Sequence, residues 1–312
     1  MNRKLQDMVL ALAALGALGM AASPAAAADP HPASGLQKQL DAMAERHHGK
    51  VALFARNLKT GETVAIDADR PVQTASTIKL PVLIEAFAQV QAGKRRLDDK
   101  IILRAGDKVQ GSGILQFLHS GIELTLEDAL WMMVIESDNT ATNLVLDQVT
   151  IPAVNARIIR MGFKDTYLYK KVYKPAEGPM PADQKKFGLG KTTAREMESV
   201  MESIETCALG DRKLCHEMIE ILKNQQYHNM IPHYLLGVDP SESESPVADK
   251  VGALDASRSD VGIYYGKNGP IVMSIYTYEN QDHSWNPENE GEMLVARMAQ
   301  AIAQAWSAPA KH

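Results

Sequence analysis

The spacing of apolar residues predicts strands near both ends of the chain and a long block of helices between them. Helical periodicity marks most of the predicted helices, whereas alternation or short apolar runs bounded by turn residues mark the strands. The predicted helices cover residues 35–48, 74–93, 125–135, 140–149, 152–161, 193–204, 213–223 and 287–305. The predicted strands cover residues 51–57, 63–67, 100–103, 247–254, 259–265 and 271–277.

This order of elements favours an α+β fold. Strands from both chain ends can pair into one antiparallel, five-stranded sheet, with the terminal helices packed on it and a helical lobe inserted between. We expect residues 29–312 to form a single domain, with an α/β lobe from about 29–72 and 240–312 and a helical lobe from about 73–239. A cleft between two such lobes is a common place for a site.

Residues 166–190 interrupt the helical pattern. Proline or glycine recurs there, at 175, 178, 179, 181, 188 and 190, and few apolar positions are periodic. A long irregular segment inside a compact domain is usually functional. We therefore expect this segment to contribute to function.

The first 28 residues match the pattern of an export signal. Arg3 and Lys4 precede an apolar run over residues 8–22, and small residues follow up to Ala28. The run is too short to predict a transmembrane helix. We therefore expect cleavage after Ala28 and an exported bacterial protein, periplasmic or secreted, with no membrane span in the mature chain.

Charge and cysteine content narrow the classes of partner. The net charge is −5 and no basic tract occurs, which argues against nucleic acid and anionic membranes as partners. The only two cysteines, Cys207 and Cys215, flank a Gly-Asp turn at 210–211. Because export leads to an oxidising compartment, we expect a disulfide between them; two buried free thiols are the alternative.

The stretch 74–80 carries the first candidate chemistry. Ser76 and Lys79 lie three residues apart, so on a helix their side chains share a face. Pro81 restricts this stretch to the first turn of a helix, where free N–H groups and the helix dipole favour developing negative charge. That setting suits a nucleophilic serine beside an amine, although Ser-x-x-Lys alone is a common pattern.

Two further motifs follow along the chain. They are Ser-Asp-Asn at 137–139, between two predicted helices, and Lys-Val-Gly at 250–252, on the first C-terminal strand. The order and spacing of the three motifs resemble those of the penicillin-recognising serine hydrolases, especially the class A β-lactamases. The resemblance covers nearly all of the chain after the leader. It implies the β-lactamase/DD-peptidase-like fold, one catalytic domain, a monomer, and no metal or organic cofactor.

The resemblance and the side-chain chemistry assign the acylation roles. Ser76 would attack a carbonyl, and Lys79 can take its proton if burial and the nearby charge of Lys250 lower the lysine pKa. Ser137 can relay a proton toward the leaving nitrogen. Taken alone, Lys79 could equally be a solvated surface residue; the three motifs together favour catalysis.

The same resemblance implies a set of substrate-binding residues. They are Gln110, Asn139, Lys250, Gly252, Ala253 and Arg258, the first of them at the cleft edge. Asn139 would orient the lysine or the substrate amide, with a simple helix cap as the alternative. Lys250 and Arg258 would hold a substrate carboxylate, with a solvated surface position as the alternative for the arginine. The backbone N–H groups of Ser76 and Ala253 would form an oxyanion hole.

Two departures from the family pattern bear on the mechanism. Val251 replaces the usual threonine or serine of the third motif, which removes a hydroxyl hydrogen bond of about 1 kcal/mol to the substrate carboxylate. The irregular segment also lacks the Glu-x-x-Leu-Asn string that activates the deacylating water in class A enzymes. Glu177, fifteen residues before Thr192, is the candidate for that base, with a solvated loop residue as the alternative. Asp183 is a weaker candidate.

We therefore predict a serine hydrolase that opens β-lactam amides through a Ser76 acyl-enzyme. Its substrate would be a β-lactam or an acyl-D-amino-acid-like small molecule. Two alternatives stay open: a hydrolase or peptidase acting on peptidoglycan-like or other amides or esters, and a penicillin-binding protein that acylates without efficient turnover. The missing loop motif keeps the last alternative open, because an acyl-enzyme without a positioned base hydrolyses slowly.

Overall fold

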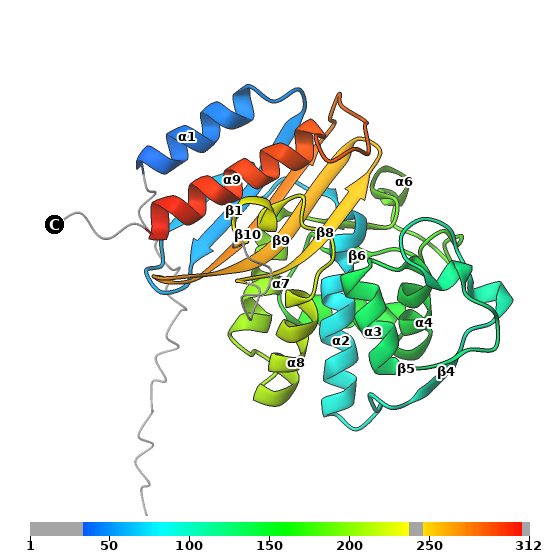
Figure 1. Cartoon of the computed structure of the whole chain (residues 1–312). Helices are drawn as coiled ribbons and strands as arrows, with labels where there is room; N and C mark the ends of the chain where they lie inside the picture. The colour runs from blue at the N-terminus through cyan, green and yellow to red at the C-terminus, as the bar shows by residue number, and fades with distance from the viewer. Residues whose placement is uncertain (1–33, 237–245, 308–312) are drawn as a thin grey trace, which may run out of the picture. The chain divides into compact units, whose positions relative to one another are not determined.

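The computed structural model describes residues 34–236 and 246–307, and the predicted leader lies outside the described residues. The helices are α1 (Ser34–Glu45), α2 (Lys79–Gln91), α3 (Leu126–Ile135), α4 (Asn139–Val149), α5 (Ile151–Arg160), α6 (Gln184–Phe187), α7 (Ala194–Glu205), α8 (Arg212–Lys223) and α9 (Glu290–Ser307). The strands are β1 (Lys50–Asn57), β2 (Thr63–Ile66), β3 (Val72–Gln73), β4 (Lys100–Ile102), β5 (Glu123–Thr125), β6 (Tyr167–Leu168), β7 (Gly190–Thr192), β8 (Val247–Leu254), β9 (Ser257–Gly266) and β10 (Gly269–Tyr278). Every helix and strand predicted above is present, with modest shifts at its ends (Figure 1).

Strands from both chain ends form one antiparallel sheet, as predicted. Its order is β2-β1-β10-β9-β8. β1 pairs along its whole length with β10, so that Lys50 lies opposite Tyr278 and Asn57 lies opposite Ile271. β8, which carries the motif at 250–252, is an edge strand. Its outer side is therefore open to contact with elements of the helical block.

The sheet is the middle layer between two sets of helices. Side chains alternate between the two faces of a strand, and both faces of β1 are buried. Val51 and Leu53 pack with α1 and α9, whereas Ala52 and Phe54 pack with α7 and the helical block. Figure 1 shows α1 and α9 side by side on one face of the sheet. Covering both faces makes the sheet a rigid base for β8.

Helix α2 is central to the helical block and packs against α4, α5, α7 and α8. Thr125 caps α3, and its side chain and that of Asp128 form a capping box. A disulfide joins Cys207, just after α7, to Cys215 in α8, which confirms the predicted pairing. Within residues 34–236 and 246–307, no helix is long and apolar enough to cross a bilayer.

A small three-stranded sheet, β3-β7-β6, was not predicted from the sequence. Its strands are two or three residues long, which is too short for alternation to show. The sheet ties the irregular segment 166–190 to the residues just before Ser76, because the Thr74 N–H donates to the Gly190 carbonyl at 3.0 Å. The segment and the turn that carries Ser76 are therefore held together.

Glu198 in α7 is a buried carboxylate behind the sheet. Its side chain has no exposed surface, and its nearest cation is the Arg56 guanidinium at 3.8 Å. Burial raises the pKa of Glu198 to about 8, although Arg56 opposes the shift. Between the ordinary value of 4.5 and this raised value, the folded state binds more protons than the unfolded state. Stability therefore falls as pH rises through this window.

We expect Glu198→Gln to stabilise the protein at neutral and alkaline pH, because glutamine never has to ionise. The midpoint of thermal unfolding should rise by about 2 °C or more at high pH, and the gain should disappear at acidic pH, where the wild-type carboxyl is protonated. Glu202→Gln is the matched control, since Glu202 contacts the same arginine at 3.5 Å but is partly exposed. Equal effects of both changes at every pH would contradict the prediction.

Candidate active site

The three sequence motifs meet at one cleft of about 720 Å³. Ser76 comes from a 3-10 turn, Ala75–Ile78, just before α2. Ser137 and Asn139 come from the junction of α3 and α4, and Gly252 comes from β8; all line the cleft. The packing of β8 on the 3-10 turn, and of α2 on α3 and α4, brings these distant segments together.

The backbone around Ser76 is strained and held in place. Ala75 has a φ of 45°, a left-handed conformation that costs a residue with a Cβ about 1 kcal/mol. Thr74 anchors the turn from one side through its bond to Gly190. Its carbonyl accepts the N–H of Thr77 at 3.1 Å and the Thr77 hydroxyl at 2.7 Å. These bonds fix the turn so that Ser76 is partly exposed toward the cleft.

Lys79, which directly follows the turn that carries Ser76, is fully buried. Its Nζ donates to the Ser137 carbonyl at 2.7 Å, to the Ser137 hydroxyl at 3.1 Å and to Asn139 Oδ1 at 3.2 Å. Burial lowers the pKa of Lys79 well below its ordinary value, and the charge of Lys250 lowers it further. The three donated hydrogen bonds are those of an ammonium group, and the lowered pKa makes loss of one proton to give the amine easier than for an exposed lysine.

The junction of α3 and α4 orients Asn139. Ser137 has a φ of 50°, and Asp138 accepts backbone N–H groups from α4 and from the loop at 110–115. Asp138 is thus the N-cap of α4. The side chain of Asn139 instead bridges the site, since its Nδ2 donates to the Gln110 carbonyl at 3.1 Å while its Oδ1 accepts from Lys79.

At Gly252, strand β8 passes very close to the turn that carries Ser76. A Cβ at this position would lie 3.1 Å from the backbone nitrogen of Ser76 and 2.7 Å from the hydroxyl of Ser259. Only glycine therefore allows this approach without displacing its neighbours. Ala253 follows on the cleft side, so the arrangement is compatible with an oxyanion hole between the N–H groups of Ser76 and Ala253.

Lys250 lies behind the cleft lining and is fully buried. Its Nζ donates to the Val251 carbonyl at 2.9 Å. Burial lowers its pKa to about 8, against the opposing charges of Asp249 and Asp260. Its positive charge is the second cause, after burial, of the lowered pKa of Lys79.

Three other predicted residues do not line the cleft. Gln110 is exposed, and its neighbours at 111–112 line the cleft instead. Glu177 is exposed and lies outside the lining. Arg258 is buried behind the lining. The weaker candidate base, Asp183, accepts hydrogen bonds from the Tyr169 hydroxyl at 2.8 Å and the Lys191 ammonium at 3.1 Å, again outside the lining.

Several cleft residues were not selected from the sequence. They are Lys170, Val172, Tyr173, Leu189, Tyr227, Asn229, Met230, Leu254, Trp285 and Glu292. The first four belong to the irregular segment 166–190. The length and irregularity of that segment were the only features of the sequence that predicted a role in the site for these residues. Glu292 resembles an ordinary acidic residue in the first turn of a helix. Among the described residues that line the cleft, it is the only carboxylate.

Comparison with known proteins agrees with this arrangement. The sequence matches the Beta-lactamase enzyme family over residues 35–306. The crystal structure of a beta-lactamase from Sphaerobacter thermophilus DSM 20745 is similar, with 32% identity, a TM-score of 0.76, and coverage of 88% of this chain and 98% of that chain.

Two further relatives differ in their described roles. The beta-lactamase regulatory protein BlaB of Streptomyces cacaoi is 28% identical over 131 residues, which is 41% of this chain and 41% of that protein. A point mutant of PBP-A, solved as an acyl-enzyme complex with penicillin G, shares the fold at 21% identity and a TM-score of 0.75, over 88% of this chain and 97% of that chain. Since the family match covers residues 35–306, which include the Ser76 turn, the Ser-Asp-Asn junction and strand β8, this chain belongs to the β-lactamase enzyme family.

Proposed function

We propose that the chain is a serine hydrolase that opens β-lactam amides through an acyl-enzyme on Ser76. The observation that carries the proposal is the buried Lys79 amine, three residues after the serine and hydrogen-bonded to Ser137 and Asn139. A buried amine of lowered pKa is a suitable base for a neutral hydroxyl.

Acylation would proceed as follows. Ser76 Oγ attacks the carbonyl carbon, its proton passes to the neutral Nζ of Lys79, and the carbonyl electron pair moves onto oxygen. The N–H groups of Ser76 and Ala253 stabilise that oxyanion. As the C–N bond breaks, the nitrogen takes the proton from the Lys79 ammonium through the Ser137 hydroxyl, which leaves an ester on Ser76. Water then cleaves the ester and restores the serine.

A second candidate is a protein that acylates and keeps the acyl group. The specific observation is that Glu177 is exposed outside the cleft lining and that the irregular segment presents Lys170, Val172 and Tyr173 to the cleft. None of these three can act as a carboxylate base for the deacylating water. This arrangement favours slow hydrolysis of the ester over fast turnover.

Intact-mass measurement with benzylpenicillin tests both candidates. We expect a covalent adduct of one penicillin per chain, mapped by proteolysis to the peptide that carries Ser76. Decay of the adduct together with release of hydrolysed penicillin supports the hydrolase, whereas an adduct that persists for hours supports the second candidate. The absence of both an adduct and hydrolysed product would overturn the two candidates together.

A further inference from the structure

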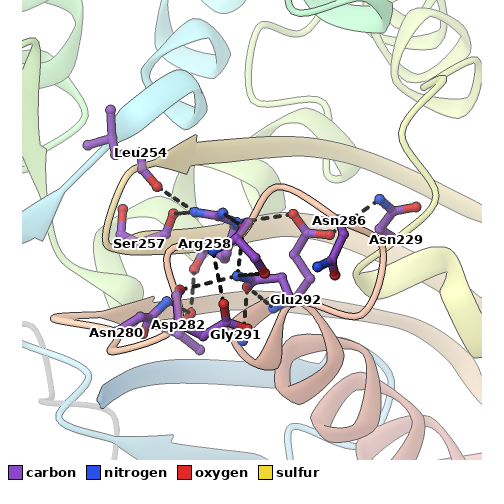
Figure 2. A network of polar contacts seen from close by, with 12 residues as sticks. Asn229, Leu254, Ser257, Arg258, Asn280, Asp282, Asn286, Gly291 and Glu292 are labelled. Atoms are coloured by element: carbon purple, nitrogen blue, oxygen red, sulfur yellow. Dashed lines mark hydrogen bonds and ion pairs between the residues drawn. The ribbon is translucent and has the colours of Figure 1, made fainter. Parts of the chain in front are cut away.

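Arg258, expected to hold a substrate carboxylate, is already engaged within the chain (Figure 2). It is fully buried, and four of its five N–H groups donate to acceptors of the protein itself. Its Nε donates to Glu292 Oε1 at 3.1 Å, and its terminal nitrogens donate to the carbonyls of Leu254, Ser257 and Ser284. The Trp285 ring lies 4.4 Å from the guanidinium carbon. The pair of guanidinium N–H groups that could bind a substrate carboxylate in a bidentate way is therefore already used within the chain.

Glu292 takes the place at this arginine that a substrate carboxylate would need. It lines the cleft, and its side chain is only 11% exposed. While one carboxylate oxygen accepts from Arg258, the other accepts from Asn229 Nδ2 at 3.3 Å. Displacing Glu292 from Arg258 would leave its charge unpaired in a nearly buried position, which is strongly unfavourable.

The other two groups expected to hold a carboxylate are also unsuited to it. Val251 offers no hydroxyl, and Lys250 is fully buried, donates to a backbone carbonyl and lies outside the cleft lining. Trp285, whose ring centre lies 4.4 Å from the Arg258 guanidinium carbon, is exposed at this end of the cleft. This end of the cleft thus presents an ion pair already closed within the chain and an apolar ring.

We infer that Glu292 determines specificity, so that the cleft selects amides or esters with no free carboxylate at the end next to β8. This inference rests on the proposed acylation of Ser76 and names the substrate class for it. A substrate anion would be partly desolvated there with no cation at this end left to pair with it, because Glu292 already neutralises Arg258. An uncharged ester or amide group carries no such cost and can pack against Trp285.

A pair of probes that differ in one charge tests the inference on the wild-type protein. Benzylpenicillin and its methyl ester share the acyl group and the ring, and intact mass distinguishes their adducts by one CH₂ group. We expect the ester to acylate Ser76 about tenfold faster than the acid, as an unpaired and partly desolvated carboxylate implies. In Glu292→Gln, acylation by the acid should accelerate by about tenfold while the ester rate stays nearly constant, because the glutamine leaves the Arg258 charge free to pair with the acid alone.

Glu290→Gln is the matched control. Glu290 lies in the same first turn of α9 but binds His47 and His48, away from the cleft, so its change should leave the acid-to-ester ratio unaltered. An acid that reacts faster than the ester in the wild type would overturn the inference, as would an unchanged ratio in folded Glu292→Gln. If neither probe modifies Ser76, the proposed function itself fails, and the inference fails with it.

Discussion

Replacing Ser76 with alanine should abolish the penicillin adduct and lower any turnover of a chromogenic cephalosporin by about three orders of magnitude or more. The reason is that no other hydroxyl can replace the nucleophile. Ser137 is engaged by the Lys79 amine through both its carbonyl and its hydroxyl. Intact mass and initial rates measure the two effects.

The Ser76→Ala effect should occur without loss of the fold, because the turn is held by Thr74 and Thr77 rather than by the serine hydroxyl. The thermal unfolding midpoint should therefore stay close to that of the wild type. Ser203→Ala is a matched control in α7, where the hydroxyl only donates to the Val200 carbonyl. An adduct that still forms on the Ser76→Ala protein would place the nucleophile elsewhere.

Replacing Lys79 with methionine should slow acylation by about three orders of magnitude, within the range for loss of a general base. Methionine fills a similar volume without a charge, so it suits a fully buried position. Stopped-flow measurement of adduct formation with a fluorescent penicillin gives the rate. Because burial lowers the pKa of Lys79, wild-type acylation should persist below the pH at which an ordinary lysine would be fully protonated.

Lys79→Arg separates the proton-accepting role from simple charge. Arginine keeps a cation and several donors near Ser137 and Asn139, but it does not lose its proton in proteins. We therefore expect this variant to acylate as slowly as Lys79→Met. If arginine restores the rate, the group at position 79 acts by its positive charge, and the base must be sought elsewhere.

The residues proposed for acylation could be selected from the sequence because they lie in short, contiguous stretches. A helical turn fixes the spacing of Ser76 and Lys79, and a tight junction fixes the relation of Ser137 to Asn139. Glu177 shows that the spacing of a residue from a motif does not by itself place its side chain in the cleft. Its distance from Thr192 fits the family, yet in the structure the side chain is exposed outside the cleft lining.

The path of the irregular segment depends on contacts with other elements. Asn143 in α4 donates to the Val172 carbonyl and accepts the Val172 N–H, both at 2.9 Å. These two bonds, together with the small sheet at β7, bring residues 170–173 to the cleft. Because the partners lie far apart in sequence, no local pattern predicts which residues of the segment face the site.

The pairing of Arg258 with Glu292 depends on where α9 begins. Apolar spacing predicted a helix from residue 287, but α9 begins at Glu290. Asn289 accepts the N–H groups of Gly291 and Glu292 at 3.0 and 3.2 Å, which sets the first turn. With α9 starting at Glu290, the Glu292 carboxylate accepts a hydrogen bond from Arg258 in β9. Because Arg258 and Glu292 lie on different elements, the sequence alone does not predict their pairing.

The pairing of β1 with β10 also bears on how the cleft is assembled during folding. Lys50 and Tyr278 lie near opposite ends of the described chain, and contacts between such distant segments are slow to form. β8 reaches the turn at Ser76 as part of that same sheet. On the proposed function, a partly folded chain has its serine and lysine but lacks β8 beside them, so that formation of a penicillin adduct on Ser76 would report completion of the sheet.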